Sequence, residues 1–204
     1  MNMVSDLVSL RDASLVLGVS AERVRQLVVA GDLPAQRFGN AWAVPREALL
    51  ARREMPALGG RPLGAKRAWG EIASGRVDPE RPGRYQRRAR VVRCEMSKAD
   101  VDSVPHLSNA LVGGVRGAVG HGASLVDDGS RDLYLAGRAF DGLAAVVAYV
   151  IDPLGSIRLR VVDDDAWEII PAGPLAPPGA VALDLLESAD PRHRIAAAEL
   201  LDDH

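Results

Sequence analysis

The sequence predicts an α+β protein with two parts, an N-terminal domain of short helices and a hairpin and a C-terminal mixed α/β domain. Three observations predict this. Two amphipathic helix patterns with capping residues and one hairpin pattern follow each other before about residue 53. Short strand and helix patterns alternate after about residue 96, and the sign of the charge changes between the two halves.

Charge separates the chain into a basic and an acidic half. Residues 1–93 carry 17 Lys and Arg against 9 Asp and Glu, a balance of +8, whereas residues 94–204 carry 8 against 18, a balance of −10. Such asymmetry predicts that the basic half contacts a polyanion. We expect three segments: residues 1–56, a basic helical or linker segment 57–95, and an acidic domain 96–204.

General features of the sequence favour a soluble protein of the cytoplasm. The chain is 48% hydrophobic, no apolar run approaches the roughly 18–20 residues that span a bilayer, and the N-terminus lacks a secretion-signal pattern. A single cysteine, Cys94, cannot form an internal disulfide, which fits a reducing compartment. We expect Cys94 to be an ordinary thiol rather than a redox switch.

Two short helices are predicted near the N-terminus. Ser9 and Asp12 form a variant of the capping box for the first helix, and Gly18 permits the left-handed backbone that ends it. Ser20 is a strong N-cap for a second helix over residues 21–30. The residues expected to face inward are Ala13, Leu15, Val16, Leu17, Val24, Leu27 and Val28.

A hairpin and a third helix follow. Residues 35–44 read as strand, turn and strand, with the turn at Gly39-Asn40. Pro45 suits the first position of a helix over residues 46–53, with Leu49 and Leu50 expected to face inward.

This succession resembles the excisionase and MerR-like winged helix-turn-helix domains. The shared features are an Ala-containing first helix, a Gly-Val-Ser turn, a second helix ending in Gly-x-Leu-Pro, and a hairpin bearing Trp42. The resemblance implies a recognition helix over residues 20–30 in the major groove of double-stranded DNA. Trp42 either stacks on DNA or joins the hairpin to the core, and the core role is favoured.

Specific DNA contacts follow from side-chain chemistry. Arg pairs with guanine and Gln with adenine through two hydrogen bonds each, so Arg23 and Gln26 are candidate sequence readers. Glu22 accepts from cytosine or complements the helix dipole, and the dipole role is favoured. The full set expected to contact DNA is Ser20, Glu22, Arg23, Arg25, Gln26, Arg37, Asn40, Arg61, Lys66, Arg67, Arg87 and Arg88.

The middle segment is rich in glycine, proline and arginine. Gly59-Gly60 marks a hinge, residues 63–74 predict a short helix, and arginines crowd residues 84–93. This basic segment has the composition for DNA phosphate contacts. The alternatives are that this segment binds RNA or that it pairs with the acidic half of the same chain.

The C-terminal half predicts a domain large enough for its own core. Strands are expected over residues 115–119, 131–136 and 156–162, with a turn at 153–155. Helices are expected over residues 140–148 and 180–187, followed by a last helix that begins at Asp190-Pro191 and faces inward with Ile195, Ala196, Ala197, Leu200 and Leu201.

No catalytic, metal or cofactor site is expected in the C-terminal half. Its histidines are scattered, and Asp163-Asp164-Asp165 reads as a loop or a helix N-terminus rather than a cation site. Gly113-Gly114 lacks the Gly-Lys-Ser/Thr of a phosphate loop and reads as a turn. We therefore expect a regulator rather than an enzyme.

The end of the chain resembles AbiEi-type antitoxin regulators, in which a winged helix precedes an α/β domain. The resemblance is carried by residues 161–201, from VVDDDAWEII to the final helix pair. It implies an autorepressing antitoxin with a nucleotidyltransferase-like toxin as partner. The alternatives are a stand-alone regulator, an excisionase-like architectural factor and, with least support, a DNA-tethered enzyme.

We also expect a homodimer or cooperative assembly on DNA, because one small winged domain reads few base pairs.

Overall fold

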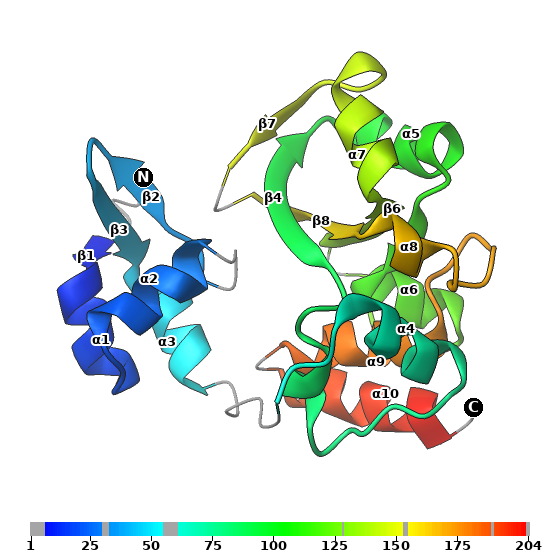
Figure 1. Cartoon of the computed structure of the whole chain (residues 1–204), viewed down its shortest axis with the longest axis horizontal. Helices are drawn as coiled ribbons and strands as arrows, with labels where there is room; N and C mark the ends of the chain where they lie inside the picture. The colour runs from blue at the N-terminus through cyan, green and yellow to red at the C-terminus, as the bar shows by residue number, and fades with distance from the viewer. Residues whose placement is uncertain are drawn as a thin grey trace. The chain divides into compact units, whose positions relative to one another are not determined.

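The computed structural model is α+β and forms two compact units, Met1–Pro56 and Ala57–His204 (Figure 1). It describes residues 7–29, 33–54, 61–127, 129–152, 155–188 and 190–202. The predicted end of the second helix at Gly31, the hinge at Gly59-Gly60 and most of the turn at 153–155 lie outside these ranges.

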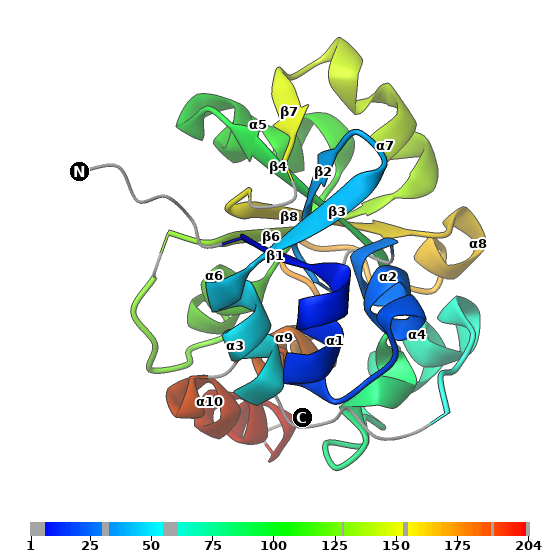
Figure 2. The ribbon, with the colours of Figure 1, turned by 90° about the vertical axis from the view of Figure 1, so that its left-hand side faces the viewer.

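The first unit combines three helices with a small antiparallel sheet. The helices are α1 (Leu10–Leu17), α2 (Ala21–Val29) and α3 (Arg46–Glu54), and the strands are β1 (Leu7–Ser9), β2 (Gln36–Phe38) and β3 (Ala41–Pro45). The sheet order is β1-β3-β2, and the β2–β3 hairpin extends away from the helices (Figure 2). The core of this unit consists of Ala13, Val24, Leu27, Val28, Leu33, Ala35, Val44 and Leu49.

Local hydrogen bonds set the helix ends of this unit as the sequence predicts. The Ser9 hydroxyl accepts from the Asp12 amide and caps α1, and Gly18 ends α1 with φ +65°. The Ser20 hydroxyl accepts from the Arg23 amide at the start of α2. Strand β1 was not predicted, because its three residues are too few to show an alternating pattern.

Two apolar residues expected inside the first unit lie at its surface. Leu15 is 77% exposed and Leu50 is 37% exposed, whereas Ala13 and Leu49 are buried. Helices this short bury only a narrow stripe, so the apolar neighbours of the stripe stay in solvent.

The second unit is built around a five-stranded sheet. Its strands are β4 (Arg90–Met96), β5 (Leu111–Gly113), β6 (Arg131–Ala136), β7 (Tyr149–Ile151) and β8 (Ile157–Val162), in the order β5-β6-β8-β4-β7. β6 and β8 are parallel, and every other neighbouring pair is antiparallel. The helices are α4 (Ala65–Ala73), η1 (Pro82–Tyr85), α5 (Lys98–Ser108), α6 (Gly114–Gly120), α7 (Gly137–Gly142), η2 (Leu143–Ala145), α8 (Asp164–Trp167), α9 (Pro178–Leu186) and α10 (Pro191–Asp202).

Helices cover both faces of this sheet. α5 and α7 lie on one side and α4, α9 and α10 on the other (Figures 1 and 2). On the α5 side the core includes Val92, Leu133 and Leu159, and on the α9 side it includes Trp69 and Tyr134. Alternating residues of each strand therefore enter two separate cores.

The predictions for β6, β8, α9 and α10 are confirmed. The helix predicted over residues 140–148 is divided between α7 and η2 and ends at Ala145. Three other predictions are wrong. Residues 115–119 form helix α6 rather than a strand, since Val115 and Ala118 are buried at helical spacing. Ile195 of α10 is 62% exposed. The segment 57–95 is no separate linker, because Trp69 and Ile72 of α4 belong to the core of the second unit.

A cluster of charged side chains, most of them buried and Glu187 and Arg158 half-buried, crosses the α9 side of the sheet. Arg160 of β8 donates from Nε to Asp132 Oδ1 (2.7 Å) and from Nη2 to Glu187 Oε2 (2.7 Å). Arg88 donates from Nη2 to both Asp184 Oδ1 (2.7 Å) and Glu187 Oε1 (2.6 Å). We call this cluster the buried charge network, and its members are Arg88, Asp132, Tyr134, Arg158, Arg160, Asp184 and Glu187.

Glu187 and Arg88 of the network are held in their charged forms, whereas burial raises the pKa of Asp184. Burial alone would raise the pKa of Glu187, but the Arg160 and Arg88 guanidinium groups hold that pKa well below its usual range. The pKa of Arg88 is raised despite burial, because Tyr134, Glu187 and Asp184 surround its guanidinium. Both groups therefore stay ionised inside the protein at neutral pH.

Arg160→Met is expected to lower the free energy of unfolding by about 3–5 kcal/mol, because it removes the guanidinium that Asp132, Asp184 and Glu187 share and leaves the charge of these carboxylates only partly balanced. Urea denaturation at neutral pH measures this. Arg138→Met is the control, since Arg138 is an exposed arginine of α7 with no ion pair among the described residues. It should change stability by no more than about 0.5 kcal/mol. Equal losses in both variants would contradict the assigned role of the network.

Acid should destabilise the protein in part through Glu187. Its pKa is lower in the folded than in the unfolded protein, so the unfolded state takes up the proton first as the pH falls below the ordinary value of 4.5. The contribution of Glu187 is thus present above that pH and lost below it. Glu187→Gln should flatten the fall in unfolding free energy between about pH 6 and about pH 3. Glu199→Gln, which changes an exposed glutamate of α10, should retain the wild-type fall.

Candidate nucleic-acid interface

Helix α2 presents a polar face to solvent. Val24, Leu27 and Val28 are buried against the core of the first unit and fix the rotation of the helix. The remaining predicted contact residues of this helix and its cap are exposed: Ser20, Glu22, Arg23, Arg25 and Gln26. Two short helices joined by a turn at 18–20, with the second exposing polar side chains, have the geometry that places a helix in the major groove.

Pairs of side chains on this face are ordered by local contacts. Arg23 Nη1 donates to Gln26 Oε1 at 3.3 Å, so the two candidate sequence readers lie side by side. Arg25 and Glu22 form an exposed ion pair at 3.6 Å. Glu22 also stands in the first turn of α2, where its carboxylate complements the helix dipole. Ser20 uses its hydroxyl as the N-cap, so its predicted DNA contact competes with a structural role.

The β2–β3 hairpin carries the second group of predicted contacts. Arg37 and Asn40 are exposed, and Arg37 Nε donates to the Gly39 carbonyl at 3.0 Å, which steadies the turn. Gly39 has φ +59°, a conformation that favours glycine. Trp42 is half-buried against the core, and the Arg37 guanidinium lies 5.8 Å from the centre of its ring. The core role favoured for Trp42 thus agrees with its packing.

The middle segment contributes its charge to the second unit. Residues 1–56 hold seven Lys and Arg against six Asp and Glu, whereas residues 57–93 hold ten against three. Arg61, Lys66, Arg67 and Arg87 are exposed there, as a contact with a polyanion requires.

The prediction that Arg88 contacts DNA is wrong. It is 3% exposed, and its guanidinium belongs to the buried charge network, so DNA cannot reach it. The alternative that basic residues pair with the acidic half is correct for Arg88. Its neighbour Arg84 is also paired, with Glu71 at 3.5 Å and Asp78 at 3.6 Å. The arginine-rich stretch also contains β4, a strand between β8 and β7 that the sequence reading missed.

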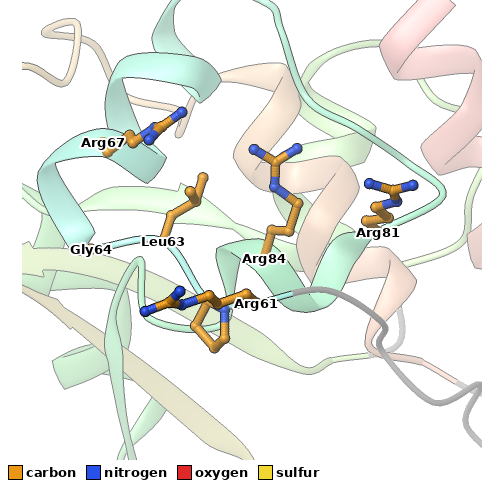
Figure 3. Close-up of a pocket in the computed structure, with 7 residues that line it drawn as sticks. Arg61, Leu63, Gly64, Arg67, Arg81 and Arg84 are labelled. Atoms are coloured by element: carbon orange, nitrogen blue, oxygen red, sulfur yellow. The ribbon is translucent and has the colours of Figure 1, made fainter.

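Four arginines surround a hollow of about 490 Å³ in the second unit (Figure 3). We call it the arginine pocket, and its lining residues are Arg61, Pro62, Leu63, Gly64, Arg67, Arg81 and Arg84. The sequence reading selected Arg61 and Arg67 but missed Arg81, which stands in a loop without periodic pattern. Only the fold brings together the two stretches of chain that carry these residues, 61–67 and 81–84.

The remaining candidates for redox or metal chemistry are Cys94 and the aspartates at 163–165. Cys94 is buried, and this burial raises the pKa of its thiol to about 11, as an unreactive thiol requires. Asp164 and Asp165 lie in the first turn of α8, as predicted for a helix N-terminus. Within the described ranges, no group of three or more His, Cys, Asp or Glu could hold a metal ion, and no helix is long and apolar enough to cross a membrane.

Comparison with known proteins supports the reading of the first unit. Residues 7–55 match the family described as helix-turn-helix domain, which is excisionase-like. No curated protein and no solved structure matches the chain, so the resemblance to AbiEi-type regulators is without support from relatives. The family match and the geometry of α1, α2 and the hairpin together indicate a DNA-binding helix-turn-helix regulator.

Proposed function

We propose that the protein is a sequence-specific transcription repressor that reads DNA through α2 and the β2–β3 hairpin. One observation carries the proposal: α2 is anchored by three buried apolar residues and holds Arg23 and Gln26 together on its exposed face. A rigid helix with an ordered Arg–Gln pair loses little side-chain entropy when it binds base edges. Binding near a promoter would then exclude the polymerase.

The two parts of the first unit have different tasks in this proposal. α2 supplies base contacts, which carry sequence information, while Arg37 and Asn40 on the hairpin contact phosphates, which fix orientation. The near-neutral balance of residues 1–56 limits non-specific attraction to DNA by this unit. Phosphate contacts by exposed residues of the second unit, Arg61, Lys66, Arg67 and Arg87, would add to affinity.

Two copies of the chain act together on DNA in this proposal. One recognition helix of nine residues reaches only a few base pairs, and specific sites generally need two half-sites. A homodimer or cooperative pair would supply the second helix. The site that the protein selects from random DNA should therefore contain a repeat.

An autorepressing antitoxin is the more specific form of this proposal. The second unit has its own two-sided core and is larger than the first, which favours a partner-binding or regulatory role over an excisionase-like architectural factor. A nucleotidyltransferase-like gene beside this one, and binding of its product to the full chain, would support the antitoxin. A stand-alone repressor would lack both.

Arg23→Ala and Gln26→Ala should each relax sequence preference, at a cost of about 1–3 kcal/mol on the preferred site. Selection from a random duplex pool by the full-length protein defines that site, and fluorescence anisotropy measures affinity for it and for a scrambled duplex. Arg138→Ala is the control and should bind both like the wild type. If the wild type enriches no sequence, or if both variants weaken binding to all duplexes equally, the proposed readout is wrong.

Arg37→Ala should weaken binding to preferred and scrambled duplexes by the same factor, because a phosphate contact carries no sequence information. The slope of log affinity against log salt concentration should become shallower by about 0.9 for one lost phosphate contact. Anisotropy titrations at several salt concentrations measure both. An unchanged slope would remove Arg37 from the interface.

A further inference from the structure

The arginine pocket is a concentration of positive charge that the folded chain does not neutralise. Arg84 is paired with Glu71 and Asp78, and Arg67 lies 3.5 Å from Glu71. Arg61 and Arg81 have no ion pair among the described residues. Two of the four guanidinium groups thus pair with two carboxylates, and the other two leave an excess of two positive charges at one hollow.

The residues around the pocket are held in place by hydrogen bonds and packing within the second unit. The Leu63 amide donates to the Arg84 carbonyl at 2.8 Å, which ties the lead-in of α4 to η1. Leu63 also packs against the core. Tyr85 donates from its hydroxyl to Glu71 Oε2 at 2.9 Å and so holds the carboxylate that pairs with Arg84. A pocket preformed in this way requires little ordering when a ligand binds.

The backbone adds donors on one side of the pocket. Gly64 is the N-cap of α4 and has no side chain to cap it, while the first intrahelical bond runs from the Ala68 amide to the Gly64 carbonyl. No side chain caps the amides of this first helical turn, whose N-cap Gly64 lines the pocket. They supplement the arginines, which line the hollow from the lead-in, from α4 and from the start of η1 (Figure 3).

We infer that the arginine pocket binds a ligand carrying phosphate groups, at a site distinct from the recognition helix. Guanidinium forks match phosphate oxygens through paired hydrogen bonds. The volume of about 490 Å³ exceeds one phosphate and lies in the range of small-molecule sites. An adjoining hollow of about 550 Å³ shares Arg67 and Arg84 and adds Arg76, with Gly70 and the paired carboxylate of Glu71 also in its lining, so arginines continue beyond the first hollow.

Phosphate groups reach this site from one of two sources, the backbone of bound DNA or a free phosphorylated small molecule. The chemistry of recognition is the same for both. A free ligand would make the second unit a sensor, whereas DNA phosphates would make it an additional clamp. Competition between a small phosphate probe and duplex DNA separates the two.

Isothermal titration of the full-length protein with inorganic pyrophosphate, at ionic strength matched by sodium chloride, tests the site. We expect saturable binding that is about tenfold or more weaker in the double variant Arg61→Ala/Arg81→Ala, which removes the two unpaired guanidinium groups. Arg138→Ala is the matched control and should bind like the wild type. Circular dichroism checks that each variant is folded.

Each outcome of the titration is decisive. Absence of saturable binding to the wild type, or an equal loss in Arg138→Ala, overturns the inference. If binding is confirmed, a repeat in the presence of saturating random duplex identifies the source: displacement of pyrophosphate assigns the pocket to DNA phosphates, and undisturbed binding assigns it to a free ligand. The variant Arg23→Ala/Gln26→Ala should retain pyrophosphate binding, so failure of the proposed DNA readout is separable from failure of this site.

Discussion

The buried charge network is the interaction on which the second unit depends, because it joins segments that no short-range contact connects. Arg88 precedes β4, Asp132 and Arg160 stand on β6 and β8, and Glu187 follows α9. Ionised groups this deeply buried are costly unless each finds its partner, so one arrangement of strands and helices is strongly preferred. The network thereby fixes α9 and the segment before β4 against the same face of the sheet.

The same constraint positions the arginine pocket. The Arg88 carbonyl accepts from Trp69 Nε1 at 2.8 Å, and the rings of Trp69 and Tyr134 pack in a T-shaped arrangement. α4 is thus attached to the network through its buried tryptophan, and the lead-in of α4 is attached to η1. The buried charge network and the arginine pocket are therefore structurally connected. The solvent-exposed arginines of the pocket stand on segments that are anchored by buried residues.

The arginines of this protein fall into two groups, buried and exposed, which the net charge alone does not distinguish. Arg88 neutralises carboxylates inside the second unit, whereas Arg61 and Arg81 are free to meet an external anion. The first unit is nearly neutral, and in the proposed function it reads DNA through the arrangement of Arg23 and Gln26 rather than through its net charge. Under that proposal the regulator would gain specificity from α2 and leave anion affinity to other surfaces.

The sequence by itself determined the first unit, and tertiary structure decided most of the second. Ser9, Gly18 and Ser20 act on backbone groups within a few residues, so their roles follow from local hydrogen bonding and were predictable. Arg88 and its partner Asp184 are 96 residues apart, and no local pattern reveals such a pair. β4 was not predicted for the same reason: its arginines indicated a surface segment, and only its neighbours in the sheet supply the apolar side chains that bury Val92 and Cys94.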